Sequence, residues 1–121
     1  MNKKYKASYD EEGDILTIYT DNKDVKESIE VSENLVLDID KNKKLINLEL
    51  IDAYKFLHTL NKDISKEMLK SIKDIVLEAK KYRNYWIITL MFRYKNQIIR
   101  EKLPAFSSTA FKSPLIASAT A

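Results

Sequence analysis

Short runs of alternating apolar and polar side chains fill the first half of this chain, and they constrain its fold more than any other feature. In one such run, Leu35, Leu37 and Ile39 fall on one side, while the residues between them fall on the other. A period of two residues is typical of β-strands. Because short sequential strands usually pair with their neighbours, residues 1–53 predict an antiparallel β-meander. Its first strand, residues 4–10, is expected at the edge of the sheet.

The pattern changes to a helical period after residue 52. Asp52 is placed to cap a short helix over residues 53–60, and Ser65 is placed to cap a second helix. We expect this second helix to continue to Tyr82, because apolar residues follow Ser65 at helical spacing. These residues are Met68, Leu69, Ile72, Ile75, Val76 and Ala79.

The strongest strand pattern covers residues 85–94, which carry apolar side chains on both faces. A polar turn at residues 95–96 leads into another strand over residues 97–103. The predicted fold class is therefore α+β: an antiparallel β-meander followed by two helices and a β-hairpin. We expect a single domain over residues 1–104 and an Ala/Ser-rich apolar tail over residues 105–121.

The composition excludes several classes of protein. Of the 121 residues, 45% are apolar and 32% are charged, which suits one folded domain. The chain has no cysteine, so disulfides and thiolate-bound metals are excluded, and its single glycine, Gly13, excludes glycine-rich loops that bind nucleotide phosphates. No apolar run is long enough to span a membrane, and the N-terminus does not resemble a signal peptide. We expect a cytoplasmic protein that uses no cofactor.

The net charge of +3 conceals an asymmetry between the two halves of the chain. Residues 1–52 hold 8 basic and 13 acidic side chains, whereas residues 53–121 hold 13 basic and 5 acidic ones. Such asymmetry can mark a surface for an acidic partner, or it can reflect two complementary halves that pack together. Cations around the predicted hairpin are candidates for contacts with nucleic acid or a partner protein: Lys80, Lys81, Arg83, Arg93, Lys95, Arg100 and Lys102.

Several motifs of the first half resemble a known family in their order and spacing. The motifs are Tyr9-Asp10 followed by Asp14-Ile15-Leu16-Thr17-Ile18, then Ser28-Ile29-Glu30-Val31, Val36-Leu37-Asp38-Ile39-Asp40 and Leu48-Glu49-Leu50-Ile51-Asp52-Ala53. They resemble the small prokaryotic domain of unknown function family 2283. The resemblance implies a small sheet followed by a helix, and it implies no established activity. Because some members of this family lie beside small toxin-like genes, it also implies a partner-binding, antitoxin-like role.

Few residues form a pattern that supports catalysis or metal binding. Asp38 and Asp40 fall on one strand face and could bind a hard cation, but they lack obvious further ligands, so we expect no metal site. His58 is the only histidine and has no Ser or Cys nucleophile near it, which favours a surface position on the short helix. Nothing activates residues 107–109 as nucleophiles. We therefore expect no catalytic site and no enzyme.

The tail combines large apolar side chains with a single charge, Lys112. We expect its apolar residues to pack on the domain or to join subunits, most simply in a homodimer. These residues are Phe106, Phe111, Leu115 and Ile116. The predicted function is a non-enzymatic protein-interaction module. The alternative is a nucleic-acid-binding protein that uses the basic second half, in which Trp86 and Phe92 would stack bases if they were exposed.

Overall fold

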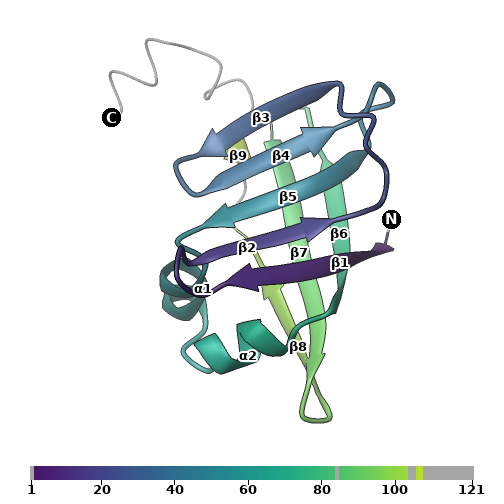
Figure 1. Cartoon of the computed structure of the whole chain (residues 1–121). Helices are drawn as coiled ribbons and strands as arrows, with labels where there is room; N and C mark the ends of the chain where they lie inside the picture. Colours follow the sequence, from purple (N-terminus) through teal and green to yellow (C-terminus); the bar gives the residue numbers. More distant parts are fainter. Residues whose placement is uncertain (1, 84, 104–105, 108–121) are drawn as a thin grey trace, which may run out of the picture.

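The structure, a computed structural model, describes residues 2–83, 85–103 and 106–107 (Figure 1). This part of the chain folds into an antiparallel β-sheet with two short helices, so the antiparallel sheet agrees with the predicted α+β fold, whereas the structure is mainly sheet and the order of its elements differs. None of its helices is long and apolar enough to cross a membrane. The strands are β1 (Asn2–Asp10), β2 (Ile15–Tyr19), β3 (Glu27–Ser32), β4 (Leu35–Ile39), β5 (Leu45–Ile51), β6 (Asp74–Lys81), β7 (Tyr85–Tyr94), β8 (Gln97–Lys102) and β9 (Phe106–Ser107), and the helices are α1 (Ala53–Leu60) and α2 (Lys66–Ser71).

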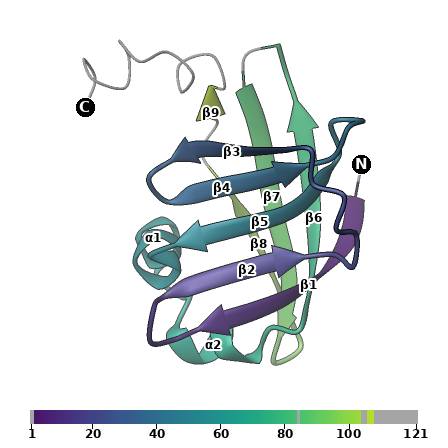
Figure 2. The same cartoon turned by 45° about the horizontal axis from the view of Figure 1, so that its top comes forward.

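One bent sheet forms two layers around a common core. Its strand order is β3-β4-β5-β2-β1-β6-β7-β8, and β9 pairs with β7. Figures 1 and 2 show β3, β4, β5, β2 and β1 in a first layer, with β6, β7 and β8 running across them in a second layer. Alternation along each strand points one set of side chains into the space between the layers. The buried set includes Leu16, Ile18, Leu37 and Leu48 from the first layer and Ile75, Leu77, Ile88 and Leu90 from the second.

Strand β1 turns the corner between the two layers. Its residues 2–6 pair with β6, and its residues 6–10 pair with β2, so Lys6 takes part in both ladders. Sheets whose layers cross at a large angle commonly use one bent strand in this way. The edge position predicted for residues 4–10 is therefore wrong. The sequence does not identify β6 as a strand, so it offers no second neighbour for β1.

The first layer has a different strand order from the predicted meander. Within the described residues, β2 pairs with β1 and β5, whereas β3 pairs with β4 alone. The connection over residues 20–26 carries the chain from β2 past β5 and β4 to the far edge. This arrangement is a Greek key, in which a long connection replaces one hairpin. The meander predicted over residues 1–53 is wrong because alternation fixes the buried face of a strand but does not choose its neighbour.

The second helix predicted over residues 65–82 is wrong in its length, because the segment contains the short helix α2 and then the strand β6. Ser65 caps α2 as predicted, because its Oγ accepts a hydrogen bond from the Met68 N–H at 3.1 Å. The helix ends after six residues, and Ile72 already has an extended backbone with φ −71° and ψ 123°. Residues Asp74–Lys81 then form β6, whose backbone pairs with β1 on one side and β7 on the other.

The apolar residues between positions 72 and 79 fit both the helical period and the strand period. Ile75 and Leu77 are buried on one face of β6, while Val76 lies on the other face. The spacing of Ile72, Ile75, Val76 and Ala79 also suits a helix, so periodicity alone does not decide between the two. The β-branched residues favour a strand, and two neighbouring strands supply backbone partners: β1 pairs with residues 74–78 and β7 with residues 76–81.

The two helices lie at the same end of the molecule and close the core there (Figure 1). Helix α1 has the predicted bounds, and its Leu57 is fully buried together with Leu69 of α2. The predicted cap is wrong, however: Asp52 has a left-handed backbone with φ 56°, and its side chain makes no capping hydrogen bond. The predicted hairpin is confirmed as β7 and β8, with Trp86 and Phe92 buried in the core.

Candidate functional site

The outer face of the second layer carries cations around a partly apolar centre. On β7, Trp86, Ile88 and the further residues at alternate positions point into the core. The residues that alternate with them therefore point outward. We define the basic face as the outer surface of β6, β7 and β8 together with Lys4 of β1. Its cations are Lys4, Lys80, Arg93, Arg100 and Lys102, its carboxylates are Asp74 and Glu78, and its apolar residues are Val76, Ile87, Met91 and Ile98.

Strand register brings these side chains together from four strands. Lys4 pairs with Val76, Val76 pairs with Met91, and Met91 pairs with Arg100, so one row crosses the whole face. The pair of Arg93 with Ile98 lies on one side of this row, two residues along the strands. Side chains in adjacent rows of a sheet face are close enough to act on a common ligand.

The centre of the basic face is hollowed. A hollow of about 520 Å³ is lined by Lys4, Asp74, Ile75, Val76, Met91, Phe92, Arg93 and Ile98. Ile98 is 67% exposed, the largest exposure of any large apolar residue in the described part of the chain. The Lys4 Nζ lies 3.6 Å from the Asp74 carboxylate, but both side chains are well exposed, so the pair contributes little to stability. Apolar surface surrounded by charge is the usual composition of an interaction surface.

Four of the seven cations predicted from the sequence belong to the basic face: Lys80, Arg93, Arg100 and Lys102. Lys81 lies on the opposite side of β6, where its Nζ is 5.9 Å from the centroid of the Trp86 ring. Arg83 and Lys95 lie in the turns at opposite ends of β7. The predicted set is therefore divided between the outer face, the inner side and the two turns.

Sequence reasoning missed Lys4 and Ile98 as members of this surface. Lys4 is about seventy residues from its neighbour Val76, so only the β1–β6 register brings it there. Ile98 does carry a signal in the sequence, because it precedes Ile99 and adjacent residues of a strand face opposite sides. One of the two isoleucines must then point away from the core of a two-layer fold.

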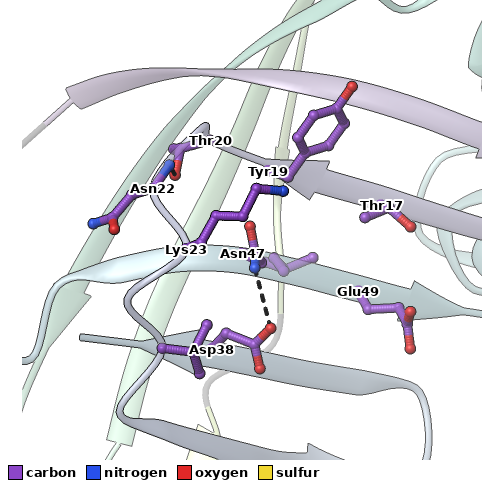
Figure 3. Close-up of a pocket in the computed structure, with 10 residues that line it drawn as sticks. Thr17, Tyr19, Thr20, Asn22, Lys23, Asp38, Asn47 and Glu49 are labelled. Atoms are coloured by element: carbon purple, nitrogen blue, oxygen red, sulfur yellow. Dashed lines mark hydrogen bonds between the residues drawn. The ribbon is translucent and has the colours of Figure 1, made fainter.

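The outer face of the first layer carries the opposite charge. Its carboxylates are Asp10, Glu30, Asp38 and Glu49. A hollow of about 380 Å³ lies on this face beside the connection over residues 20–26. Figure 3 shows Tyr19, Asn47 and Glu49 along the hollow, with Lys23 directed over the strand surface. The charge asymmetry of the sequence thus appears mainly as two outer faces of opposite sign.

The two aspartates considered as metal ligands have separate roles. Asp38 accepts hydrogen bonds from the Ser28 Oγ at 2.7 Å and the Asn47 Nδ2 at 3.2 Å (Figure 3 shows the latter). Asp40 Oδ1 accepts from the backbone N–H groups of Asn42 and Lys44, at 2.8 and 2.9 Å, and so shapes the turn between β4 and β5. In the described part of the chain, no group of three or more His, Cys, Asp or Glu side chains is arranged to hold a metal ion.

A half-buried carboxylate joins the first layer to helix α1. Asp14 Oδ1 accepts a hydrogen bond from the Tyr9 hydroxyl at 2.7 Å and another from the Tyr54 N–H at 2.8 Å. Burial disfavours the charged carboxylate, but hydrogen bonds from Tyr9, Tyr54 and Lys55, together with the charge of Lys66, outweigh burial and lower the pKa of Asp14. Asp14 therefore caps α1 from a distant turn, in the role predicted for Asp52.

The pKa of the Tyr9 hydroxyl is shifted in the opposite direction to that of Asp14. Burial raises the pKa of Tyr9, and the hydrogen bond to Asp14 raises it further, because the proton of the phenol is held by the neighbouring carboxylate. Asp14 also accepts at its backbone, where the Ala53 N–H donates to the Asp14 carbonyl oxygen at 2.9 Å. Tyr9, Asp14 and Ala53 all belong to the motifs that carry the family resemblance, and here each has a structural role.

Residues 6–53 match the family described as Protein of unknown function (DUF2283). The match confirms the resemblance seen in the sequence. No curated protein and no solved structure matches the chain. The DUF2283 segment contains the whole first layer except the beginning of β1, and it ends at the first residue of α1. Every residue of the basic face lies outside the DUF2283 segment.

His58 connects helix α1 to the loop before α2. Its Nδ1 lies 2.9 Å from the carbonyl oxygen of Ile64, and its ring stacks on Tyr54 with 4.9 Å between ring centroids. A carbonyl oxygen can only accept, so Nδ1 carries the proton and donates it. Residue His58 is half-buried, which is less exposed than the predicted surface position.

The tail candidates are only partly described. Phe106 lies in β9, where it pairs with Trp86 of β7. Phe111, Leu115 and Ile116 lie outside the described residues, as do two of the three hydroxyl residues of the stretch 107–109. The proposed role of the tail in self-association therefore stays a prediction.

Proposed function

We propose that this protein is a non-enzymatic interaction module that binds an acidic partner protein through its basic face. The observation that carries the proposal is the joining of an exposed apolar centre with cations from four strands on one layer, whose outer face no described residue covers. Apolar contacts supply affinity at such surfaces, while charge complementarity steers the encounter and selects the partner.

Other parts of the molecule support a binding role for the basic face and a structural role for the remaining polar groups. The groups that could suggest chemistry are engaged in holding the fold: Asp14 caps α1, Asp40 shapes a turn, and His58 links α1 to the next loop. The carboxylates on the outer face of the first layer lie within the DUF2283 segment, whereas the basic face is formed by residues outside it. We infer that the partner is recognised by the part of the chain that lies outside this family.

The proposal includes several finer statements that come from the sequence. The antitoxin-like role is the form of partner binding that the family resemblance implies. A cytoplasmic location suits a chain without cysteine. A homodimer joined by the apolar tail would be compatible with partner binding, because the tail and the basic face involve different residues.

Co-purification with a matched pair of charge variants tests the proposal. The face variant is Arg93→Glu with Arg100→Glu, and the control is Lys26→Glu with Lys41→Glu, which makes the same change in net charge at exposed positions of the first layer's far end. A stoichiometric partner should be retained from the native host by the wild type and the control, and lost by the face variant. A partner retained equally by all three proteins would show that the basic face is not its binding site.

Nucleic-acid binding is the second candidate, and a pair of tyrosines favours it. Tyr82 and Tyr85 stack with 4.8 Å between ring centroids at one end of the basic face, and both are exposed. Exposed aromatic rings beside cations are typical of single-strand binding surfaces. Filter binding of an oligonucleotide at two salt concentrations tests this candidate, because phosphate contacts make affinity fall steeply with salt. Loss of binding in Tyr85→Ala and in the face variant would favour it, and no binding at low salt would exclude it.

A further inference from the structure

Strand β8 leaves one edge of the sheet open. It is the last strand in the order of the sheet, and its residues pair with β7 on one side only in the part of the chain that the structure describes. The residues Ile98, Arg100 and Lys102 are all exposed. An open strand edge presents unpaired backbone N–H and C=O groups to any extended segment that approaches it.

The turn before β8 determines which backbone groups point to this edge. Lys95 and Asn96 both have positive φ, 48° and 64°, which is the geometry of a two-residue type I′ hairpin turn. The flanking residues Tyr94 and Gln97 are then a hydrogen-bonded pair, and such pairs alternate with non-hydrogen-bonded pairs along the ladder. The N–H and C=O groups of Gln97, Ile99 and Glu101 are therefore used by β7.

The remaining residues of β8 direct their backbone groups to the open edge and their side chains to the basic face. Ile98, Arg100 and Lys102 direct their N–H and C=O groups at the open edge. The same three residues carry their side chains on the basic face, because alternate residues of a strand share a face. One edge thus offers a regular row of backbone donors and acceptors beside one apolar and two cationic side chains.

We propose that β8 receives an extended acidic segment of a partner protein as an additional antiparallel strand. This inference rests on the proposed function and specifies how the partner binds. Residues that are directly opposite each other in a ladder lie on the same face and interact. The segment would therefore place carboxylates opposite Arg100 and Lys102 and an apolar residue opposite Ile98, so that charge complementarity selects both the sequence and the register of the added strand.

The charges of β8 also act against two of the registers in which a second copy of the chain could pair with this edge. In a two-fold antiparallel pair centred on Arg100, this side chain would face its own copy. In a pair centred on Glu101, Arg100 would face Lys102. Like charges directly opposite each other destabilise a strand pair, and cations on an edge are a common protection against self-pairing. An acidic strand removes this repulsion and is the occupant that these charges favour.

Hydrogen exchange at single residues of β8, measured by NMR, tests the proposal on the intact chain. The probe is an N-acetylated eight-residue peptide with the sequence Thr-Glu-Thr-Glu-Thr-Val-Thr-Thr, in which the two glutamates and the valine can lie opposite the two cations and the isoleucine of β8. The control is a scrambled peptide of the same composition without this alternation. In the free protein, the N–H groups of Ile98, Arg100 and Lys102 should exchange much faster than those of Ile99 and Glu101. Saturation with the alternating peptide should slow the first three about tenfold or more, because they become hydrogen-bonded, and the scrambled peptide should leave them unchanged.

Two variants add an independent measurement of affinity by fluorescence anisotropy. Arg100→Pro removes one N–H that faces the open edge without removing a β7–β8 hydrogen bond, and proline is tolerated at such positions. It should weaken binding of the alternating peptide about tenfold or more. Lys102→Gln should weaken binding more than Lys80→Gln, which removes the same charge from the far side of the face. If Arg100→Pro is not folded, hydrogen exchange and the comparison of Lys102→Gln with Lys80→Gln still test strand addition.

The outcomes separate this inference from the proposed function. Equal binding of both peptides with no protection at the edge would overturn strand addition and leave the basic face as a binding surface for acidic groups. Failure of any peptide to bind would also overturn strand addition. The co-purification experiment with the charge variants would still test whether the basic face binds a partner. Protection of the same three N–H groups at high protein concentration without peptide would assign the edge to a second copy, against the proposal.

Discussion

Replacing Asp14 by Asn should destabilise the fold, although Asp14 lies in a turn on the surface of the sheet. The carboxylate of Asp14 accepts hydrogen bonds from the Tyr9 hydroxyl and the Tyr54 N–H on the same oxygen. The substitution keeps the size of the side chain and suits the left-handed backbone of this residue, φ 55°, which asparagine tolerates well. Its effect therefore comes from the loss of the negative charge and of one acceptor.

The magnitude follows from two contributions. Asparagine can still cap α1, but it loses the attraction between a negative charge and the N-terminus of the helix, which contributes about 0.3–1 kcal/mol. A hydrogen bond to a charged group contributes about 1.5–3 kcal/mol and one to a neutral group about 0.5–1.5 kcal/mol, and the amide oxygen of the asparagine can still accept both bonds as neutral ones. We expect Asp14→Asn to lower the free energy of unfolding by about 1–2 kcal/mol at pH 7. Urea unfolding followed by the fluorescence of Trp86 measures this directly, because Trp86 is the single tryptophan and is only 4% exposed.

The effect should depend on pH with a defined sign. Folding lowers the pKa of Asp14, so its carboxylate stabilises the fold at pH values above the ordinary aspartate pKa of about 4. This stabilisation is lost as the pH falls through the lower pKa of the folded state. The difference in unfolding free energy between the wild type and Asp14→Asn should therefore be largest near neutral pH and should decrease on acidification below about pH 4.

Asp52→Asn is a matched control for this prediction. Asp52 is also an aspartate with a left-handed backbone and precedes α1 directly, but its side chain makes no capping hydrogen bond. Its replacement should change the free energy of unfolding by less than about 0.5 kcal/mol. A larger loss in Asp52→Asn than in Asp14→Asn would refute the reasoning, and so would a difference for Asp14→Asn that does not change between neutral and acidic pH.

Four further predictions address the core, the phenol, the tail and metal binding. Ile72→Ala should cost about 2–5 kcal/mol in urea unfolding, because the side chain is 5% exposed; a loss below about 0.5 kcal/mol would place it outside the core. The raised pKa of Tyr9 favours the neutral phenol in the folded state, so wild-type stability should fall as the pH rises above about 10, and Tyr9→Phe should lack this component. Deletion of residues 108–121, which keeps β9, should give a folded monomer in light scattering, and an unchanged oligomeric state would remove these residues from the interface. Calcium or magnesium should leave the melting temperature unchanged, whereas a shift abolished by Asp38→Asn would establish a metal site.

Local pattern was sufficient for much of the secondary structure. The short strands of the first half, helix α1 and the hairpin of β7 and β8 are all predicted by residue period and turn composition. These features depend on neighbours within a few residues, so the sequence contains them directly. The serine cap of α2 is predicted for the same reason, since Ser65 and Met68 are three residues apart.

Pairing between distant segments was not available from local pattern. The order of strands in the first layer, the identity of β6 and the corner in β1 each depend on which segments meet in the folded chain. The cap of α1 shows the same limit: Asp14 is forty residues from Tyr54, and only the packing of the β1–β2 turn against the helix brings them together.

The basic face, too, depends partly on local sequence and partly on tertiary structure. The sequence by itself determined that cations are concentrated in the second half of the chain and that Ile98 and Ile99 cannot share one face. Only the tertiary structure decided that Lys4 joins Arg93 and Arg100 on one outer face, that Lys81 is directed away from it, and that β8 ends the sheet. The physical reason is that charge and period belong to single residues and short segments, whereas a surface depends on the register of strands that are distant in the chain.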